Sequence, residues 1–380
     1  MSTVATLGVD DVATHAVMLL DHRRVDLYAE ALAAQVQPGD VVADIGAGSG
    51  ILAALAARAG ARRVFAVERG PVAHLARKIL MASGLDGIVE VLRGDAREVA
   101  LPEPPTMLIS ETLGNFGIDE DTLSLFALLT RRCAPEVRTI PQRVEPMMAL
   151  LSDSALSSEL ATLTSLRGLD LRLLRASLVH RVLPCRLDPS ILASAPVPAG
   201  SFRVGLDVSP RTLTTTLRAS QQGEVNALGG WFRAYLTDTI LLDTGPLNPP
   251  THWSHLLFPI DPPIFCEEGD VVEVALTPRY LPSLHLWTWQ VRLGSELRQG
   301  DAFSALLGDA RDIAAQISSG GLPPAVQTRL EALRIAFQGP AVAPAEMGRR
   351  LFAAYPDRYA SEADAEQEIW ALLRAYASLR

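Results

Sequence analysis

The residues best suited to bind a ligand follow three successive stretches of sequence that are predicted to be strands. Residues 41–46 run into a glycine-rich segment, residues 63–68 end in Glu68, and residues 89–95 lead into Asp95 and Ala96. Glycines allow a backbone to approach a ligand closely, and an acid at the end of the second strand can accept hydrogen bonds from both ribose hydroxyls. We therefore predict a site for a nucleoside-containing cofactor, formed by Asp44, Gly46, Gly48, Gly50, Glu68, Asp95 and Ala96.

The spacing of the glycines narrows the choice of cofactor. The segment D-I-G-A-G-S-G at 44–50 lacks the G-x-G-x-x-G pattern that cradles a pyrophosphate, and the chain has no G-K-S or G-K-T for a triphosphate. It is similar to the segment with which class I methyltransferases bind the amino-acid end of S-adenosylmethionine. The resemblance implies S-adenosyl-L-methionine as cofactor and S-adenosyl-L-homocysteine as product. No metal is expected, because no two His or Cys residues stand at ligand spacing.

The elements that must position these residues alternate between strands and helices. Helices are predicted over 51–60 and 71–84, between the three strands, and a fourth strand is predicted over 106–111. This order indicates a parallel sheet with right-handed crossovers. Glu111 ends the fourth strand, at the carboxyl edge of the sheet where ligands bind. Residues 1–144 are thus predicted to form an α/β, Rossmann-like domain.

The pattern changes near Pro141. From 145 to 299 the segments are short and extended with turns between them, which predicts an antiparallel sandwich or barrel. Residues of about 160–182 interrupt this region and are predicted to be a helical insertion, which could be an interface or pack locally. Trp287 and Trp289 alternate on a strand and are assigned to the core or an interface. Residues 300–380 are predicted to form a small helical module.

Composition limits the possible partners. The 380 residues carry a net charge of −9, which argues against a protein whose main task is to bind nucleic acid. The three cysteines lie far apart, and we find neither a signal peptide nor a stretch long and apolar enough to cross a membrane. A cytoplasmic protein is expected. Lys78 is the single lysine beside 33 arginines, a bias typical of a GC-rich, bacterial genome.

Four further features resemble the protein arginine methyltransferases, over residues 14–298. Residues 15–28 resemble the N-terminal helix that folds over the cofactor, and Ser110-Glu111-Thr-Leu-Gly114 followed by Glu120 matches the spacing of the family's double-glutamate hairpin. Residues 251–253, Thr-His-Trp, resemble its THW loop. The change at Pro141 resembles the junction of its Rossmann-like domain with a β-barrel. Beside these four features, the insertion at 160–182 lies where the family has a helical dimerisation arm.

The resemblance implies a role for each matching residue. Glu111 and Glu120 would clamp a guanidinium, because carboxylates accept its planar donors in pairs. Asp21 and His252 would form a proton relay, with the carboxylate orienting the imidazole. Arg24 would bind the carboxylate of the cofactor, while His15 and Met18 would lie over it. Tyr28 and Trp253 are assigned to substrate binding, and the protein is expected to be a homodimer.

The chain departs from the family where Thr112-Leu-Gly-Asn115 replaces the usual Trp-Met-Gly-Tyr, so an aromatic wall is missing. We therefore keep three functions open. The first is N-methylation of a guanidino nitrogen of arginine type in a peptide, a protein or a small molecule. The second is methylation of another amine or a hydroxyl of a specialised metabolite. The third is a non-catalytic, dimeric scaffold that binds the cofactor. The first two call for a cationic or amine substrate.

Overall fold

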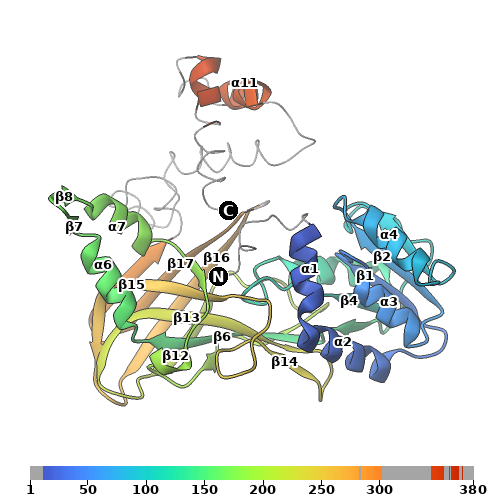
Figure 1. Cartoon of the computed structure of the whole chain (residues 1–380), viewed down its shortest axis with the longest axis horizontal. Helices are drawn as coiled ribbons and strands as arrows, with labels where there is room; N and C mark the ends of the chain where they lie inside the picture. Colours follow the sequence, from blue (N-terminus) through green and yellow to red (C-terminus); the bar gives the residue numbers. More distant parts are fainter. Residues whose placement is uncertain are drawn as a thin grey trace. The chain divides into compact units, whose positions relative to one another are not determined.

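The computed structural model describes residues 12–281, 284–301, 344–354, 359, 361–367 and 370 (Figure 1). These residues divide into two compact units. The first unit contains residues 1–151, 184–217 and 228–257, and the second contains 152–183, 218–227 and 258–380. Every residue of the predicted site belongs to the first unit. The predicted boundary after residue 144 falls inside strand β6 (Arg143–Leu151).

The first unit contains a five-stranded parallel sheet in the order β3-β2-β1-β4-β5. Its strands are β1 (Val41–Ile45), β2 (Arg63–Glu68), β3 (Val89–Arg93), β4 (Met107–Ser110) and β5 (Arg138–Ile140). All residues of β1 and β4 are buried, as expected for strands covered on both faces. The order reverses between β1 and β4, where Ile45 pairs with Ser110. This is the point at which an open α/β sheet binds its ligand.

Three helices lie between or after these strands, and two precede them. They are α1 (Val12–Leu20), α2 (His22–Gln35), α3 (Ile51–Arg58), α4 (Ala73–Ala82) and α5 (Thr122–Leu129). The single helix predicted over 15–28 is wrong in one respect, because the helix is interrupted at Asp21, between α1 and α2. The side chain of Asp21 accepts a hydrogen bond from the backbone of Arg24 and so caps the start of α2.

The region after Pro141 forms two further sheets. One has the order β10-β6-β13-β15-β9, with β11 on β6 and β14 on β13, and the other has the order β12-β16-β17-β18. Their strands other than β6 are β9 (Leu183–Cys185), β10 (Val197–Pro198), β11 (Phe202–Arg203), β12 (Leu213–Arg218), β13 (Gly223–Tyr235), β14 (Leu241–Asp243), β15 (His255–Cys266), β16 (Val271–Leu281), β17 (Leu284–Leu293) and β18 (Glu296–Asp301). Trp287 and Trp289 are buried and pack edge-on against Phe258, which confirms their assignment to a core.

The helical insertion is larger than predicted and is not continuous. Helix α6 (Ser154–Thr162) is followed by a hairpin of β7 (Ser165–Leu166) and β8 (Leu169–Asp170), and then by α7 (Arg172–Val179). The insertion starts at 154 because Asp153 caps α6. Arg175 of α7 pairs with both carboxylate oxygens of Asp261, at 2.7 and 2.5 Å, and fixes the insertion to β15.

The C-terminal part is described only in pieces. Helix α11 (Pro344–Ala354) agrees with the predicted helical module, and residues 362–367 are also helical. Residues 302–343 of the predicted module lie outside the described residues. No helix among the residues that the structure describes is long and apolar enough to cross a membrane.

Candidate active site

The glycine-rich segment after β1 has the backbone conformation that only glycine adopts readily. Gly46, Gly48 and Gly50 have φ angles of 70°, 53° and 84°. A Cβ on Gly46 would lie 2.6 Å from Cγ2 of Thr112, and one on Gly48 would lie 2.9 Å from Cε1 of His15. The glycines therefore give the segment both its turn and the room that its neighbours occupy.

Two acids hold this segment in place. Each carboxylate oxygen of Glu68 accepts one backbone N–H, from Gly48 at 2.9 Å and from Gly70 at 2.6 Å. Each oxygen keeps a further lone pair, so Glu68 can still accept from ribose hydroxyls. Asp44 accepts from the N–H of Ala53 in α3, and burial raises its pKa to about 7. Asp44 therefore supports the start of α3 from inside the domain.

The predicted adenine contacts lie at the end of β3. Asp95 and Ala96 are half-buried, and Asp95 accepts a hydrogen bond of 2.8 Å from the backbone N–H of Arg97. The guanidinium of Arg97 lies 3.4 Å from Asp95 and 3.7 Å from Asp121. Asp95 and Ala96 follow β3, and Glu68 ends the neighbouring strand β2, so all three residues lie at the same edge of the sheet.

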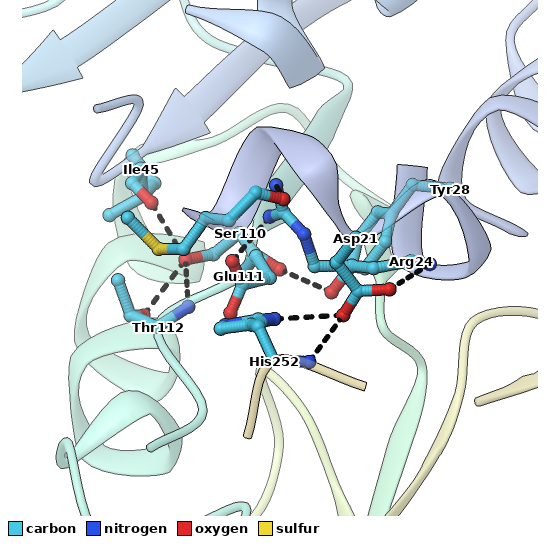
Figure 2. A network of polar contacts seen from close by, with 9 residues as sticks. Asp21, Arg24, Tyr28, Ile45, Ser110, Glu111, Thr112 and His252 are labelled. Carbon is cyan, nitrogen blue, oxygen red and sulfur yellow. Dashed lines mark hydrogen bonds and ion pairs between the residues drawn. The ribbon is translucent and has the colours of Figure 1, made fainter. Parts of the chain in front are cut away.

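A network of polar contacts joins α1, α2 and the end of β4 (Figure 2). Nη1 of Arg24 donates to Oε2 of Glu111 at 2.5 Å, and its Nη2 donates to the carbonyl oxygen of Met18 at 2.8 Å. Arg24 was predicted to bind the cofactor's carboxylate, and in this structure its ion pair is with Glu111. Its Nε and the Nε2 of His15 are buried and have no partner in the described part of the chain. The site thus keeps two unused nitrogens beside the glycine-rich segment.

Glu111 and Glu120 lie at the two ends of residues 111–120, which we call the double-glutamate segment. Burial raises the pKa of Glu111, against the opposing effect of the positive charge of Arg24. Neighbouring protein, with the negative charges of Asp119 and Glu111, raises the pKa of Glu120 to about 8, although the residue is exposed to solvent. The two glutamates therefore interact electrostatically and form one acidic site.

His252 is paired with Asp21, as predicted (Figure 2). Its ring Nδ1 lies 2.9 Å from Oδ2 of Asp21, and its backbone N–H donates to the same oxygen at 2.8 Å. Burial would raise the pKa of Asp21, but the hydrogen bonds from His252 and Arg24 outweigh it and lower the pKa to about 2. Asp21 is therefore a carboxylate that fixes the orientation of the imidazole ring.

Residues 249–254, which we call the histidine loop, are held by groups that the sequence does not reveal. Arg23 donates to the carbonyl oxygen of Pro249 at 2.9 Å, and Arg186 donates to that of Thr251. The side-chain oxygen of Asn115 accepts from the N–H of Ser254 at 3.0 Å. Among these three, Asn115 alone has a signal in the sequence, since it lies where the chain departs from the family pattern.

The two residues assigned to substrate binding, Tyr28 and Trp253, are both buried. Tyr28 is fully buried and donates to the carbonyl oxygen of Ser110 at 2.9 Å. Trp253 is 4% exposed and packs edge-on against Phe232, with ring centroids 5.1 Å apart. These contacts give both residues a packing role, and their assignment to substrate binding stays a prediction.

The chain is similar in sequence to proteins that are named as arginine methyltransferases. The chain is 32% identical over 277 residues to "Arginine N(omega)-methyltransferase" of Streptomyces achromogenes subsp. streptozoticus, covering 69% of this chain and 75% of that protein. The chain belongs to the arginine methyltransferase family. It is 28% identical over 299 residues to "Protein arginine N-methyltransferase PRMT10" of Oryza sativa subsp. japonica, covering 68% and 79% of the two chains. A family model for the ribosomal protein L11 methyltransferase matches residues 21–80.

Solved structures of arginine methyltransferases share the fold. PRMT1 of Trypanosoma brucei, in an enzyme–prozyme heterotetrameric complex with AdoHcy, superposes with a TM-score of 0.70 at 23% identity, over 77% of this chain and 99% of that one. Protein arginine methyltransferase 10 of Arabidopsis thaliana superposes with a TM-score of 0.64. The predicted family, the Rossmann-like fold with an antiparallel sheet domain and the cofactor S-adenosylmethionine are therefore confirmed. The chain is an S-adenosylmethionine-dependent methyltransferase.

Proposed function

We propose that the protein transfers a methyl group from S-adenosylmethionine to a guanidino nitrogen of arginine or an arginine derivative. The observation that carries the proposal is the acidic site of Glu111 and Glu120 beside the Asp21–His252 pair. A guanidinium is a planar cation with five donors, and it stays protonated at neutral pH because its pKa exceeds 12. Two neighbouring carboxylates with one oriented imidazole suit such an acceptor better than a neutral hydroxyl.

The residues around the glycine-rich segment fit the cofactor. The unused buried nitrogens of Arg24 and His15 are donors suited to the carboxylate of its amino-acid part, and Glu68 can accept from its ribose. Asp95 and Ala96 would contact the adenine. S-adenosylmethionine, when bound, supplies the methyl group as part of a sulfonium electrophile. The task left to the protein is to align the acceptor nitrogen and to exclude water.

The acidic site would bind and polarise the acceptor. Glu120 has a raised pKa of about 8, so a bound guanidinium would draw it to the charged form and release a proton. Glu111 already holds one cation, Arg24, and has further lone pairs for a second. Carboxylates on two nitrogens of a guanidinium would hold the positive charge there and leave the third nitrogen more nucleophilic.

His252 would take the proton that the acceptor nitrogen loses. With Nδ1 bonded to Asp21, the ring nitrogen Nε2 is the one that can accept a proton. The positive charge of His252 acts to lower the pKa of Glu111, so the imidazole lies within electrostatic reach of the acidic site. A protonated His252 would in turn be stabilised by the carboxylate of Asp21.

The test is an acceptor panel with product analysis. S-adenosylhomocysteine formation is measured with arginine, an arginine-containing peptide and a non-guanidine amine, and mass spectrometry locates the new methyl group. The Streptomyces relative is named for arginine itself and the rice relative for protein arginine, so both acceptors belong in the panel. Glu111→Gln and Glu120→Gln should each lower kcat/KM by about 100-fold or more, because each removes a charge-assisted partner of the acceptor. Full turnover in either variant, or a methyl group on a non-guanidine atom, would contradict the proposal.

A homodimer formed through the helical insertion completes the proposal. The insertion exposes three leucines, Leu166, Leu169 and Leu174, at 47, 65 and 52% of their surface. Complete burial of an exposed leucine is favourable by about 1.5–3 kcal/mol, so covering these half-exposed side chains contributes about 1–1.5 kcal/mol each. Analytical ultracentrifugation of the protein and of Leu169→Asp should give a dimer and a weakened dimer, and a monomeric unmodified protein would refute this part.

A further inference from the structure

The double-glutamate segment is built around the carboxylate of Asp119. This carboxylate accepts backbone N–H groups from Asn115 at 3.0 Å and from Phe116 at 2.8 Å. It also fills the space beside Gly114, where a Cβ would overlap it, and Gly114 has a φ of 60°. Burial raises the pKa of Asp119 to about 6, so the group is ionised at pH 7 and can accept both bonds. Asp119 therefore fixes the turn that carries Asn115.

The turn held by Asp119 places Asn115 against the histidine loop. Its side-chain oxygen accepts from the N–H of Ser254, two residues after His252, at 3.0 Å. These residues are 139 positions apart in the chain. The bond therefore joins the segment that ends in both glutamates to the loop that carries the imidazole.

A second, apolar contact runs parallel to this bond. A Cβ on Gly117 would lie 2.8 Å from Cβ of Phe232, so the segment packs closely against the base of this side chain. Phe232 in turn packs edge-on against Trp253, at 5.1 Å between centroids. The polar and the apolar contact together fix the two parts of the site at two places, which restrains rotation as well as distance.

We propose that Asn115, held by Asp119, is a positioning residue that sets His252 relative to Glu111 and Glu120. The inference rests on the proposed function, because it assigns His252 a role in removing the proton from an acceptor bound by the glutamates. Neither side chain is assigned to contact the acceptor. Both act through backbone groups, of Ser254 in one case and of the turn in the other.

The experiment compares Asn115→Ala with Asn115→Asp, which keeps a side-chain oxygen for Ser254. Asn248→Ala is the matched control, since Asn248 lies just before the histidine loop and its backbone N–H donates to the carbonyl oxygen of Gly245, a bond that the substitution keeps. Asn115→Ala should lower kcat about 10-fold, leave KM for the acceptor within about 2-fold, and leave the thermal midpoint near that of the control. Asn115→Asp should keep most of the activity.

Amide hydrogen exchange gives a readout that does not depend on the acceptor. The Ser254 amide should exchange at least 10-fold faster in Asn115→Ala and at the original rate in Asn115→Asp. In Asp119→Ala, the amides of Asn115 and Phe116 should also exchange faster. Unchanged Ser254 exchange in Asn115→Ala, or faster exchange with full kcat, overturns the inference. A lower kcat in Asn115→Ala that comes with a thermal midpoint clearly below that of the Asn248→Ala control would also overturn it. If the unmodified protein methylates no guanidine, the proposed function fails, while the exchange data still decide whether Asn115 holds the loop.

Discussion

Replacing Asp21 by Asn removes the charge that supports His252 while keeping the size of the side chain. The carboxylate accepts from the N–H of Arg24, the N–H of His252 and Nδ1 of His252, at 3.0, 2.8 and 2.9 Å. Its pKa lies near 2 instead of 3.8. At about 1.4 kcal/mol for each tenfold difference, this corresponds to about 2 kcal/mol of stability at neutral pH. The side chain is 5% exposed, so solvent screens these bonds only weakly.

The sign of the pH dependence follows from the direction of the shift. A carboxylate with a lowered pKa stabilises the folded protein above its unfolded pKa, and this stability is lost as the pH falls through the folded value. The difference in free energy of unfolding between the protein and Asp21→Asn should thus be constant at about 2 kcal/mol from pH 7 to 5 and shrink between about pH 4 and 2.

Urea denaturation over this pH range measures the difference, with Asp26→Asn as the control. Asp26 is exposed on the same helix and should change stability by less than about 0.5 kcal/mol. In methyl transfer, Asp21→Asn should lower kcat by about 100-fold or more, because an amide can present its N–H to Nδ1 and favour the wrong tautomer. Equal stability of both variants at pH 7, together with unchanged kcat, would show that the Asp21–His252 pair has neither effect.

Three further predictions follow from the site. Glu120 must be charged to bind a cation, and its pKa is about 8, so the KM for the acceptor should rise up to tenfold for each pH unit below 8. Steady-state kinetics at pH 6–9 measure this dependence, which Glu120→Gln should lose. Arg24→Met leaves Glu111 buried without its cation, so urea denaturation should show a loss of about 3 kcal/mol in the free energy of unfolding. The double variant Arg24→Met/Glu111→Gln should recover part of this loss, and equal stability of the single and double variants would contradict the ion pair. Gly46→Ala puts a Cβ 2.6 Å from Cγ2 of Thr112 at a φ of 70°, so urea denaturation should show a loss of about 3 kcal/mol in the free energy of unfolding. Calorimetry should show weaker binding of S-adenosylhomocysteine, and native-like values in both experiments would contradict the packing.

The parallel sheet was predictable because its inner strands β1, β2 and β4 are buried on both faces. Such strands are short apolar runs, and β2 has the bounds predicted for it, residues 63–68. Strand β15 has no clear signal in the sequence, because Pro259, Pro262 and Pro263 are residues that strands usually avoid. The structure accommodates these prolines in the strand, and the carbonyl oxygen of Pro259 accepts from Nε1 of Trp289 at 2.8 Å. Prolines can therefore lie within a strand where a side chain from another strand forms a hydrogen bond with the backbone carbonyl.

The candidate site was predictable where a motif carries it and not where tertiary contacts build it. The pairing of Asp21 with His252 followed from the family resemblance, which supplied both residues. The bonds of Arg186 to Thr251 and of Asn115 to Ser254 join residues 65 and 139 positions apart, and no local pattern predicts either pairing, although Asn115 lies where the chain departs from the family motif. The burial of Tyr28 and Trp253 has no local pattern either, since an aromatic residue in a motif can pack inside a domain as well as line a site.

The histidine loop has a thermodynamic consequence for catalysis. Backbone groups at four of its residues, Pro249, Thr251, His252 and Ser254, are bonded to side chains from distant parts of the chain. Ordering a residue of a free loop costs about 1–2 kcal/mol of backbone entropy. Here that cost falls on folding rather than on acceptor binding, so binding energy from a small acceptor is not consumed in ordering the imidazole. A loop prepared in this way suits an enzyme whose acceptor offers few contacts beyond its reactive group.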